Sequence, residues 1–457
     1  MIFDKIFPPA VIHMIGIGGI SMSGLAEILK NKGYIVKGSD MTESSVTEKL
    51  NKSGIPVSIG HDPKNIGNAD AIIFTAAIKK DNPEYREAER RNIPLIERSV
   101  LLGEITKMFP ETIAVSGTHG KTTTTSMLAS AFLEAGKDPT VTVGGELEKI
   151  HGNYKIGNDK FLITEACEYV ESFLKFFPKT AIVLNVDADH LDYYKDLHHI
   201  QTSFQKFLDK LPENGFAVLN ADDKNSQDLI SNTKATVFTF GIENNANYMA
   251  KNIAFSNEEV KYDFYKDGTF QDTITLHVFG KHNIYDSLAC LAVCDLYHLP
   301  LKNVKNALSE FSGAKRRFEK KGSLNGAAIY DDYAHHPAEI KATLSAAKAK
   351  KLNRIICVFQ PHTYSRTKAL LTEFSQAFAD ADQVIVTDIY AAREKDTGLI
   401  SASDLADKIN SVSQNAIYMK NFSEIEDYLK KSLSEGDLFL TIGAGNVYQI
   451  GEDLISD

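Results

Sequence analysis

The stretch AVSGTHGKTTTTSMLASAF, residues 114–132, combines an apolar run, two glycines and a lysine ahead of a long helical pattern. The apolar run before Gly117 predicts a buried strand, and the residues after Lys121 predict a helix that ends near Gly136. The common pattern G-x-x-x-x-G-K-[ST] would need glycine at position 115, where Val115 stands, so this loop is shorter. Strand, glycine turn and helix still follow in the order that aims backbone N–H groups at a phosphate chain. The stretch therefore predicts a nucleotide-binding loop, with Lys121 along the β- and γ-phosphates.

The composition indicates an ordinary globular chain of several domains. A chain of 457 residues is too long to fold around one hydrophobic core. Of its residues, 43% are hydrophobic and 24% are charged. A formal net charge of -10 gives no overall attraction for nucleic acid, so an anionic ligand must be held locally. The four cysteines include no C-x-x-C pair and are interpreted as small buried apolar residues. Since neither a signal peptide nor a membrane-spanning run is visible, we expect a cytoplasmic protein with no nucleic-acid or membrane partner.

Short β-rich runs alternate with helical segments along nearly the whole chain. They include VIHMIGIGG, ADAIIFTAA, FLITEA, TAIVLNVDAD, RIICVFQP and DLFLTIGAG, and such alternation favours parallel sheets covered by helices. One patch differs: ANYMAKNIAFSNEEVKYDFYKDGTFQDTITLHVFG alternates around a KDG turn and predicts antiparallel strands. The pattern divides the chain into three sections, with boundaries near residues 105 and 315.

Acidic residues and a histidine follow two of the apolar runs. Glu165 ends FLITE, and Asp187, Asp189 and His190 follow TAIVLNV. The carboxyl ends of parallel strands share one edge of a sheet, so these side chains are expected beside the nucleotide loop. Some of them, together with the Thr122 hydroxyl, are candidate ligands of Mg²⁺.

A second glycine turn lies near the start of the chain. IHMIGIGGISMSGLAEIL places Gly16 and Gly18 after an apolar run, with Ser21 where a third glycine would complete a dinucleotide-binding fingerprint. Asp40 follows about twenty residues later, where it would accept hydrogen bonds from ribose hydroxyls or a base. The chain therefore has two expected phosphate-binding turns, and the first need not bind ATP.

A set of motifs spans nearly the whole chain: GIGGISMSG, GSD, SGTHGKTTTT, EACEYVESF, NVDADHLDYY, GKHN, KRRFE, DDYAHHPAEI, QPHTYSRT and DIYAARE. Together they resemble those of the Mur ligases, the ATP-dependent amino-acid-adding enzymes of peptidoglycan synthesis. The resemblance implies an α/β enzyme of three domains. These are a Rossmann-like domain for a UDP sugar (1–105), a central P-loop ATPase-like α/β domain with a small antiparallel patch (106–315), and a Rossmann-like C-terminal domain for the amino acid (316–457). DDYAHHP and QPHTYSRT, in order after THGKTTTT, favour a member that adds L-alanine.

The resemblance also implies a reaction. ATP would phosphorylate the lactyl carboxylate of UDP-N-acetylmuramate, and the amine of L-alanine would attack the acyl phosphate, with release of ADP and phosphate. A carboxylate is a poor acyl donor until phosphoryl transfer gives it a good leaving group, but its charge opposes its approach to a triphosphate. Lys121 and Mg²⁺ or Mn²⁺ held by Thr122, Glu165 and His190 would neutralise that approach.

Matching the motifs residue by residue extends the expected sites. The residues expected to bind ATP are Gly117, Thr118, His119, Gly120, Lys121, Thr122, Thr123, His282, Asn283 and Asp332. Those expected to bind the UDP sugar are Gly16, Gly18, Gly19, Ser21, Asp40, Thr75 and His335, with His336 as the alternative to His335, and those for L-alanine are His362 and Arg366. Lys121, Glu165, His190 and Arg317 would carry the catalysis.

Four positions around these sites need separate mention. Arg317 would reach across a domain junction toward the transferred phosphoryl group, whereas Arg316 is interpreted as a solvated linker charge. Asp286 stands where the family usually has a second asparagine after GKHN, and Ala76 stands where relatives commonly have a second serine. Both departures put a contact in doubt.

Three other functions are compatible with the sequence. A relative that couples a tripeptide to UDP-N-acetylmuramate would share the chemistry. A nicotinamide-dependent oxidoreductase would use the first glycine turn but leave Lys121 without a role, and a nucleotide-gated binding module would close on ATP without forming an amide. The choice among L-alanine, glycine and L-serine depends on one or two methyl contacts, worth about 1 to 3 kcal/mol, which the sequence does not identify.

Overall fold

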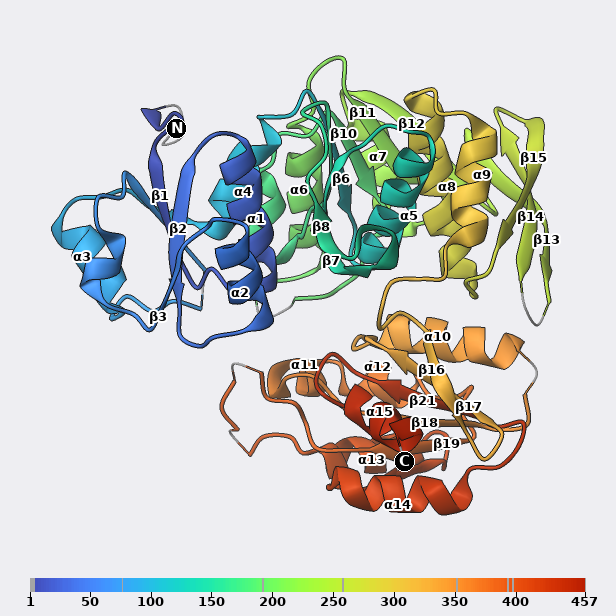
Figure 1. The fold of residues 1–457 in the computed structure, drawn as a ribbon. Coiled ribbons are helices and arrows are strands. Elements are labelled where there is room, and N and C mark those ends of the chain that lie inside the picture. The colour runs from blue at the N-terminus through green and yellow to red at the C-terminus, as the bar shows by residue number, and fades with distance from the viewer. Residues whose placement is uncertain are drawn as a thin grey trace.

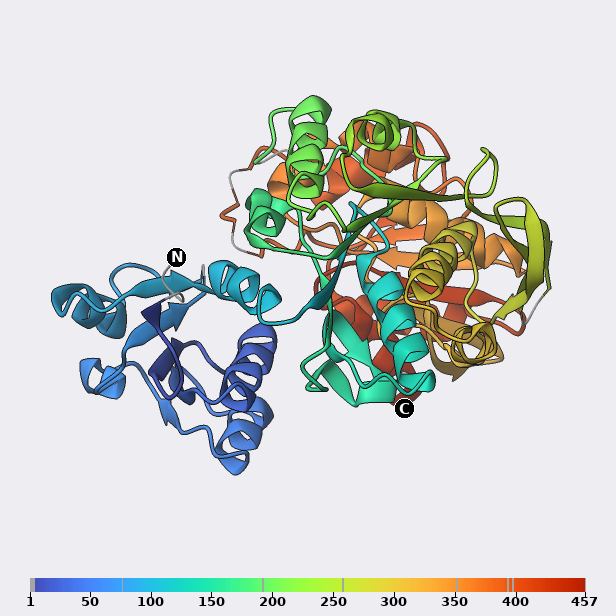
Figure 2. The same cartoon turned by 90° about the horizontal axis from the view of Figure 1, so that it is seen from above.

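The computed structural model describes residues 5–75, 77–190, 193–256, 259–350, 352–392, 394–396 and 398–456, and Ala76 lies outside them. The chain forms three α/β units, each built on its own sheet. Figures 1 and 2 show the N-terminal unit beside the central unit, and the C-terminal unit against another side of the central unit. The expected α/β class with three domains is confirmed. Within the described residues, no helix is both long and apolar enough to span a membrane.

The N-terminal unit is a parallel five-stranded sheet of order β3-β2-β1-β4-β5. Its elements are β1 (Val11–Ile15), α1 (Ile20–Asn31), β2 (Ile35–Asp40), α2 (Ser45–Lys52), β3 (Val57–Ile59), η2 (Pro63–Ile66), β4 (Ala71–Phe74), α3 (Pro83–Arg90), β5 (Leu95–Glu97) and α4 (Arg98–Thr106). The strand order reverses between β1 and β4, which is where ligands bind in open α/β sheets. The first glycine turn follows β1, so it lies at this crevice.

The central unit is a ten-stranded sheet of order β15-β14-β13-β12-β11-β10-β6-β9-β7-β8. Its strands are β6 (Glu111–Ser116), β7 (Thr140–Leu147), β8 (Gly152–Lys155), β9 (Phe161–Glu165), β10 (Thr180–Val183), β11 (Phe216–Asn220), β12 (Thr236–Gly241), β13 (Tyr248–Phe255), β14 (Val260–Lys266) and β15 (Thr269–Leu276). Its helices are α5 (Lys121–Glu134), η3 (Glu148–Ile150), η4 (Tyr169–Lys175), α6 (Leu197–Leu208), η5 (Lys224–Ser226), α7 (Gln227–Asn232), α8 (Lys281–Leu296) and α9 (Leu301–Glu310). Strand β6 lies between β9 and β10, all three parallel, so the ends of these strands meet beside the loop after β6.

The expected antiparallel patch is present, but it extends the central sheet instead of forming a separate layer. Strands β13, β14 and β15 pair antiparallel, and the KDG turn joins β14 to β15. The patch joins the rest of the sheet through parallel pairing of β12 with β13.

The C-terminal unit is a six-stranded sheet of order β16-β17-β21-β18-β19-β20, parallel except for the β16–β17 pair. Its elements are β16 (Glu319–Leu324), β17 (Ala327–Asp332), α10 (Pro337–Ala349), β18 (Ile355–Phe359), α11 (Tyr364–Ala369), α12 (Leu371–Ser375), β19 (Gln383–Val386), α13 (Ala402–Asn410), β20 (Ala416–Tyr418), α14 (Phe422–Ser432), β21 (Leu438–Ile442) and α15 (Tyr448–Ser456). Asp332 ends β17, and QPHTYSRT follows β18.

Apolar clusters cover both faces of the central sheet, which explains the unbroken apolar runs of its inner strands. One cluster packs α5, α8 and α9 against the sheet and includes Phe132, Leu288 and Leu308. A second cluster on α6 and η4 includes Phe173 and Phe207, whose rings stack 4.8 Å apart. Three of the four cysteines are buried as expected, but Cys167 is exposed because it lies in the loop after β9.

The N-terminal unit contacts the central unit through α4, which packs on η4. Gly103 in α4 is buried, and a Cβ added there would collide with the carbonyl oxygen of Lys175. The helix backbone can approach η4 this closely only because position 103 has no side chain.

We therefore expect Gly103→Ala to lower the free energy of unfolding by about 1 to 3 kcal/mol, because the added methyl overpacks this contact. Thermal unfolding followed by circular dichroism measures the change. Gly451→Ala is the matched control, since Gly451 is also a buried helical glycine but its Cβ would meet other atoms only at 3.4 Å or beyond. The control should gain up to about 1 kcal/mol from helix propensity, and an equal gain for Gly103→Ala would contradict the prediction.

Candidate active site

The turn between β6 and α5 has the backbone geometry of a phosphate-binding loop. Gly120 precedes the first residue of α5 with φ of +86°, a left-handed conformation that favours glycine. The free N–H groups in the first turn of α5 can then meet an anion at this end of the helix. Asn185, after β10, fixes the loop, since its side chain accepts from the His119 N–H at 2.8 Å and donates to the His119 carbonyl at 3.1 Å.

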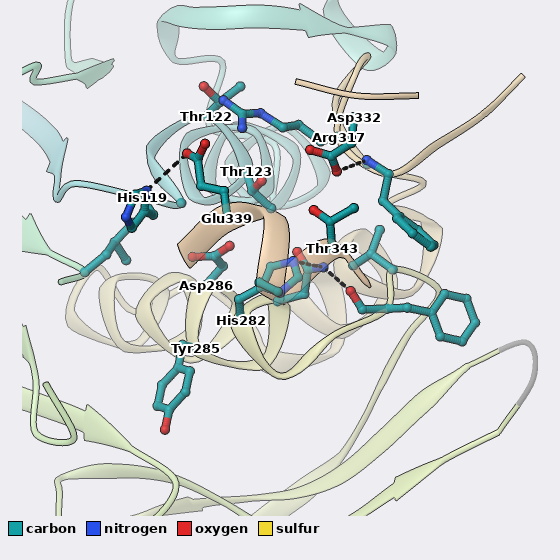
Figure 3. Close-up of a pocket in the computed structure, with 18 of the residues that line it drawn as sticks. His119, Thr122, Thr123, His282, Tyr285, Asp286, Arg317, Asp332, Glu339 and Thr343 are labelled. Atoms are coloured by element: carbon teal, nitrogen blue, oxygen red, sulfur yellow. Dashed lines mark hydrogen bonds and ion pairs between the residues drawn. The ribbon is translucent and has the colours of Figure 1, made fainter. Parts of the chain in front are cut away.

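A cavity of about 570 Å³ lies in front of this loop, between the central and C-terminal units, and we call it the P-loop cavity. Its lining brings together most of the residues expected to bind ATP, and the catalytic candidate Arg317: His119, Gly120, Thr122, Thr123, His282, Asn283, Asp332 and Arg317. Figure 3 shows these groups approaching from α5, from the start of α8 and from the C-terminal unit. The other three expected ATP ligands, Gly117, Thr118 and Lys121, are not part of the lining.

Lys121 is turned toward the strand ends. Its Nζ donates to the carbonyls of Gly117 and Thr118 at 2.5 and 3.0 Å, and it lies 2.9 Å from Oε2 of Glu168. Burial disfavours the ammonium, but the charge and hydrogen bond of Glu168, together with Cys167 and Glu165, outweigh this effect and raise the pKa of Lys121. Glu168 was not among the expected site residues, although it lies in EACEYVESF only three positions after Glu165.

The two carboxylates after β9 have different partners. Glu165 Oε1 accepts from the Gly144 N–H at 2.6 Å, whereas Glu168 Oε1 lies 3.7 Å from Nε2 of His190. The His190 ring also packs on Tyr169, with ring centres 4.6 Å apart. Within the described residues, no group of three or more His, Cys, Asp and Glu side chains forms a metal site. The expected ligand set of Thr122, Glu165 and His190 therefore stays a prediction.

A larger cavity of about 1,210 Å³ opens between all three units, and we call it the interdomain cleft. Its lining contains expected residues from each unit: Gly19, Ser21 and Thr75 from the first, Glu165 and His190 from the second, and His362 and Arg366 from the third. Arg98, which was not anticipated, also lines the cleft and donates from Nη1 to Ser21 Oγ at 3.0 Å. Some of the sugar and metal candidates and both amino-acid candidates thus face one space.

Four residues expected to bind the sugar are not part of the cleft lining: Gly16, Gly18, Asp40 and His335. Asp40 accepts from the Gly18 N–H at 2.8 Å, so its carboxylate braces the glycine turn. His335 lies in the C-terminal unit, where its Nδ1 is 3.0 Å from the Tyr333 carbonyl oxygen and 3.5 Å from Glu339.

Arg366 lies across the junction between the C-terminal and central units. Its Nη2 is 3.4 Å from Oδ1 of Asp189, and its Nη1 is 3.3 Å from Nδ1 of His362. Burial, with the nearby charges of His335 and Arg366, lowers the pKa of His362 to about 4, so this imidazole is neutral at pH 7. The guanidinium is therefore oriented toward a carboxylate at the wall of the cleft.

The two arginines of KRRFE have different surroundings. Arg317 lines the P-loop cavity with its guanidinium 5.3 Å from the centre of the Tyr333 ring. Arg316 is bound within the C-terminal unit, where Nε lies 3.0 Å from Asp331 and Nη2 donates to the Gly443 carbonyl at 2.7 Å. The interpretation of Arg316 as a solvated linker charge is therefore wrong, because the carboxylate and carbonyls of its own unit bind it.

Asp332 is one of two acidic residues of the C-terminal unit that line the P-loop cavity, the other being Glu339. Its carboxylate accepts the N–H groups of Ala334 and Phe318 at 2.7 and 2.8 Å. Burial raises the pKa of Asp332 to about 6, against the opposing effects of Arg317 and these two N–H groups.

His119 joins the nucleotide loop to the C-terminal unit. Its Nδ1 lies 3.1 Å from Glu339 of α10, and its Nε2 lies 3.3 Å from Asp187 of the central unit. Figure 3 shows the contact between His119 and Glu339. Burial disfavours the imidazolium, but the two neighbouring carboxylates of Asp187 and Glu339 together outweigh this effect and raise the pKa of His119 to about 9. The loop that would hold a phosphate is therefore tied to another domain by a charged pair.

The P-loop cavity and the interdomain cleft meet at one segment. Asp187 lines the P-loop cavity, whereas the next three residues, Ala188, Asp189 and His190, line the cleft. A nucleotide with its phosphates on the loop would thus end near a cleft that all three units line. This geometry suits transfer of a phosphoryl group to a second ligand.

Comparisons with known proteins agree across the chain. The Mur ligase family catalytic domain matches residues 11–110, the Mur ligase middle domain 115–294, and the Mur ligase glutamate ligase domain 316–445. A UDP-N-acetylmuramate–L-alanine ligase of Acetivibrio thermocellus is 52% identical over 448 residues, which cover 98% of this chain and 96% of that protein. The chain belongs to the Mur ligase family. The resemblance inferred from its motifs is confirmed.

Other Mur ligases extend the comparison. A UDP-N-acetylmuramate–L-alanine ligase of Caldanaerobacter subterraneus is 48% identical, with 98% of this chain and 97% of that protein covered. Among solved structures, the UDP-N-acetylmuramate-alanine ligase MurC of Thermotoga maritima matches with a TM-score of 0.80 and 32% identity, covering 97% and 98% of the two chains. A murein peptide ligase of Psychrobacter arcticus shares the fold, with a TM-score of 0.69 and 24% identity over 98% of each chain. Membership in a ligase family rules out the nicotinamide-dependent oxidoreductase considered from the first glycine turn.

We expect Glu339→Gln to lower the pKa of His119 from about 9 toward its ordinary value of 6.5, because one of the two carboxylates beside the imidazole is lost. Glutamine can keep the capping contact with the N–H of His336 that Glu339 makes at the start of α10. Titration of the imidazole signals by NMR measures the change.

The same variant should change how stability depends on pH. The raised pKa of His119 gives stability that is fully present below pH 6.5 and is lost as pH rises through about 9. The decline in melting temperature over this window should be smaller in Glu339→Gln. Glu310→Gln is the control, since Glu310 is an exposed acid 3.6 Å from Lys149, and equal titration of His119 in all three proteins would refute the pairing.

Proposed function

We propose that this chain joins L-alanine to the lactyl carboxylate of UDP-N-acetylmuramate at the expense of ATP, giving UDP-N-acetylmuramoyl-L-alanine, ADP and phosphate in peptidoglycan precursor synthesis. The observation that carries the proposal is the segment Asp187–His190, whose first residue lines the P-loop cavity and whose other residues line the cleft between all three units. The relatives that are 48% and 52% identical over nearly the full length carry the name of this ligase.

In the phosphoryl-transfer step, the P-loop cavity would hold ATP. The N–H groups at the start of α5, Lys121 and Arg317 would bind the phosphates, while His282, Asn283 and Asp332 would meet the nucleoside. A carboxylate oxygen of the sugar nucleotide attacks the γ-phosphorus, and the bond from that phosphorus to ADP breaks. Lys121 would then give up part of its contact with Glu168 and bind phosphate oxygens instead. Its ammonium would stabilise the negative charge that accumulates as the carboxylate approaches the triphosphate.

In the amide-forming step, the interdomain cleft would hold the other two substrates, UDP-N-acetylmuramate and L-alanine. The glycine turn with Gly16, Gly18, Gly19 and Ser21, braced by Asp40, would hold the UDP diphosphate together with Thr75, and His335 would contact the muramyl part. The amine of L-alanine attacks the acyl carbon, the carbon–oxygen bond to phosphate breaks, and the nitrogen loses its proton. Enclosure by three units would keep water from the acyl phosphate.

A divalent cation would complete the phosphate site. Thr122, Glu165 and His190 offer a hydroxyl, a carboxylate and an imidazole around the loop, which fits Mg²⁺ or Mn²⁺ because such ions bind to few protein groups and take further ligands from phosphates and water. When bound, the cation supplies charge neutralisation at the phosphoryl oxygens. The requirement for ATP and a nucleotide sugar supports a cytoplasmic location.

Product mass after incubation with ATP, Mg²⁺, UDP-N-acetylmuramate and one amino donor tests the function. The donors are L-alanine, glycine, L-serine and the tripeptide that peptidoglycan recycling releases. We expect an L-alanine adduct, with ADP formed only when both acceptor and donor are present. A tripeptide adduct instead would assign the chain to the peptide-adding relatives, and ADP without any adduct would indicate a nucleotide-gated binding module.

We expect Arg366→Lys to raise KM for L-alanine by about 10- to 100-fold, with little change in KM for ATP, because an ammonium cannot form the paired hydrogen bonds of a guanidinium with a carboxylate. Steady-state ADP release with each substrate varied in turn measures both constants. Lys368→Ala is the control, since Lys368 is an exposed cation on the same helix. An unchanged KM for L-alanine would remove Arg366 from the amino-acid site.

A further inference from the structure

Asp286 is a buried carboxyl group at the P-loop cavity that the proposed reaction leaves without a role. It lies on α8, one turn after His282, and is 3% exposed. Figure 3 shows Asp286 and His282 projecting from the same helix. Both residues line the cavity, so Asp286 belongs to the surface that a bound nucleotide would meet.

The two oxygens of Asp286 have different surroundings. Oδ1 accepts from the Thr124 hydroxyl at 3.0 Å and also lies against the loop, where a Cβ on Gly120 would be 2.5 Å away. Oδ2 is buried, and none of the described residues supplies it with a hydrogen-bond partner. An unpaired buried oxygen at a cavity wall is costly unless a ligand satisfies it.

The charged and titratable groups around this cavity do not pair with Asp286. The other charged and titratable residues in its lining are His119, Asp187, Asp222, Asp223, His277, His282, Tyr285, Arg317, Lys320, Tyr330, Asp332, Glu339 and Lys350. Arg317 favours the carboxylate, but no ion pair with Asp286 occurs among the described residues, and Lys121 is held by Glu168. Burial, with the smaller opposing effects of Thr124 and Arg317, raises the pKa of Asp286 to about 8. The neutral acid is therefore the main form at pH 7.

We propose that Asp286 serves the nucleotide site as a neutral carboxylic acid, in which Oδ1 accepts the Thr124 hydroxyl and the Oδ2–H donates to an acceptor atom of the bound nucleoside triphosphate. The inference rests on the proposed function, since it assumes that the P-loop cavity holds ATP. A protonated carboxyl offers one acceptor and one donor, the same pair that an asparagine amide offers. At a position where the family usually has asparagine, Asp286 would thus keep the same hydrogen-bonding pattern. Unlike that of asparagine, however, its pattern would depend on pH.

The ionised form cannot do the same. A carboxylate has no donor, and its charge would face the phosphates of an anionic ligand in a buried site. If only the neutral form binds, ATP affinity declines as pH rises above the pKa of about 8, by about tenfold for each further pH unit. His119 and Lys350 have pKa values of about 9 and about 8 and also lose charge in this range, so the comparison must be made between variants.

Calorimetric titration of Mg²⁺-ATP into the full chain at about pH 7 and about pH 9 tests the inference. Asp286→Asn supplies the same donor and acceptor at both pH values, so it should bind like the unchanged protein at the lower pH and about tenfold more tightly than it at the higher pH. Asp295→Asn is the matched control on α8, because Asp295 bonds with Tyr248 and Lys266 away from the cavity, and it should follow the unchanged protein. Parallel loss of affinity in Asp286→Asn and the unchanged protein would overturn the inference, whereas absence of ATP binding in every protein would overturn the proposed function.

A direct observation of the proton is independent of ATP. The infrared spectrum of the unchanged protein at neutral pH, minus that of Asp286→Asn, should contain the carbonyl band of a protonated carboxylic acid. Thr124→Val provides a second variant, because loss of a donor to the carboxylate should raise the pKa of Asp286 and move the loss of ATP affinity to higher pH. A carboxylate band alone at neutral pH, or a move to lower pH in Thr124→Val, would show that Asp286 is ionised and exclude the role.

Discussion

Lys121 is largely withdrawn from water and needs an anionic partner, and this requirement organises the site. Lys121 is held by two carbonyls of its own loop and by Glu168, which is itself buried beside His190. Moving an ammonium out of water is costly unless charge and hydrogen bonds replace the lost hydration. The strand ends of β6, β9 and β10 must therefore stay in register, because they bring the lysine, its carboxylate and the Asp187–His190 segment together. Phosphates can compete for the same ammonium, so the network that stabilises the loop is also the one that a nucleotide would rearrange.

Charged pairs across domain junctions give the site its second constraint. His119 contacts Glu339 of the C-terminal unit, and Asp189 contacts Arg366 of the same unit. Both central-unit partners lie in loops that follow adjacent parallel strands, β6 and β10, so the C-terminal unit binds the central unit at the edge where the cavities meet. Hydrogen bonds with charged groups depend steeply on distance and direction. Relative motion of the two units would thus change the nucleotide loop and the amino-acid end of the cleft together.

The same residues show how local helix signals serve the active site. Glu339 completes the capping box of α10 through the backbone of His336, and its other oxygen meets His119. Gly120 begins α5 in a left-handed conformation and leaves room for Asp286 of α8. In both cases a residue at the start of a helix also lines the P-loop cavity. Burial then adjusts the proton affinities: it raises those of Asp332 and Asp286 and lowers that of His282, whereas two carboxylates reverse its effect on His119.

The sequence by itself determined the three α/β units, the antiparallel patch, the nucleotide loop and the family, because these depend on residue periods, turn residues and motif order within short stretches. It also indicated several of the groups around each cavity, since functional residues follow strand ends. Only the tertiary structure decided that Lys121 pairs with Glu168, that Asp40 braces the glycine turn, that Arg316 is bound within its own unit, and that His119 reaches Glu339, more than 200 residues away in the chain. Neighbouring carboxylates look alike in a sequence. Their partners and pKa values depend on burial and on distances between separate domains, which no local pattern contains.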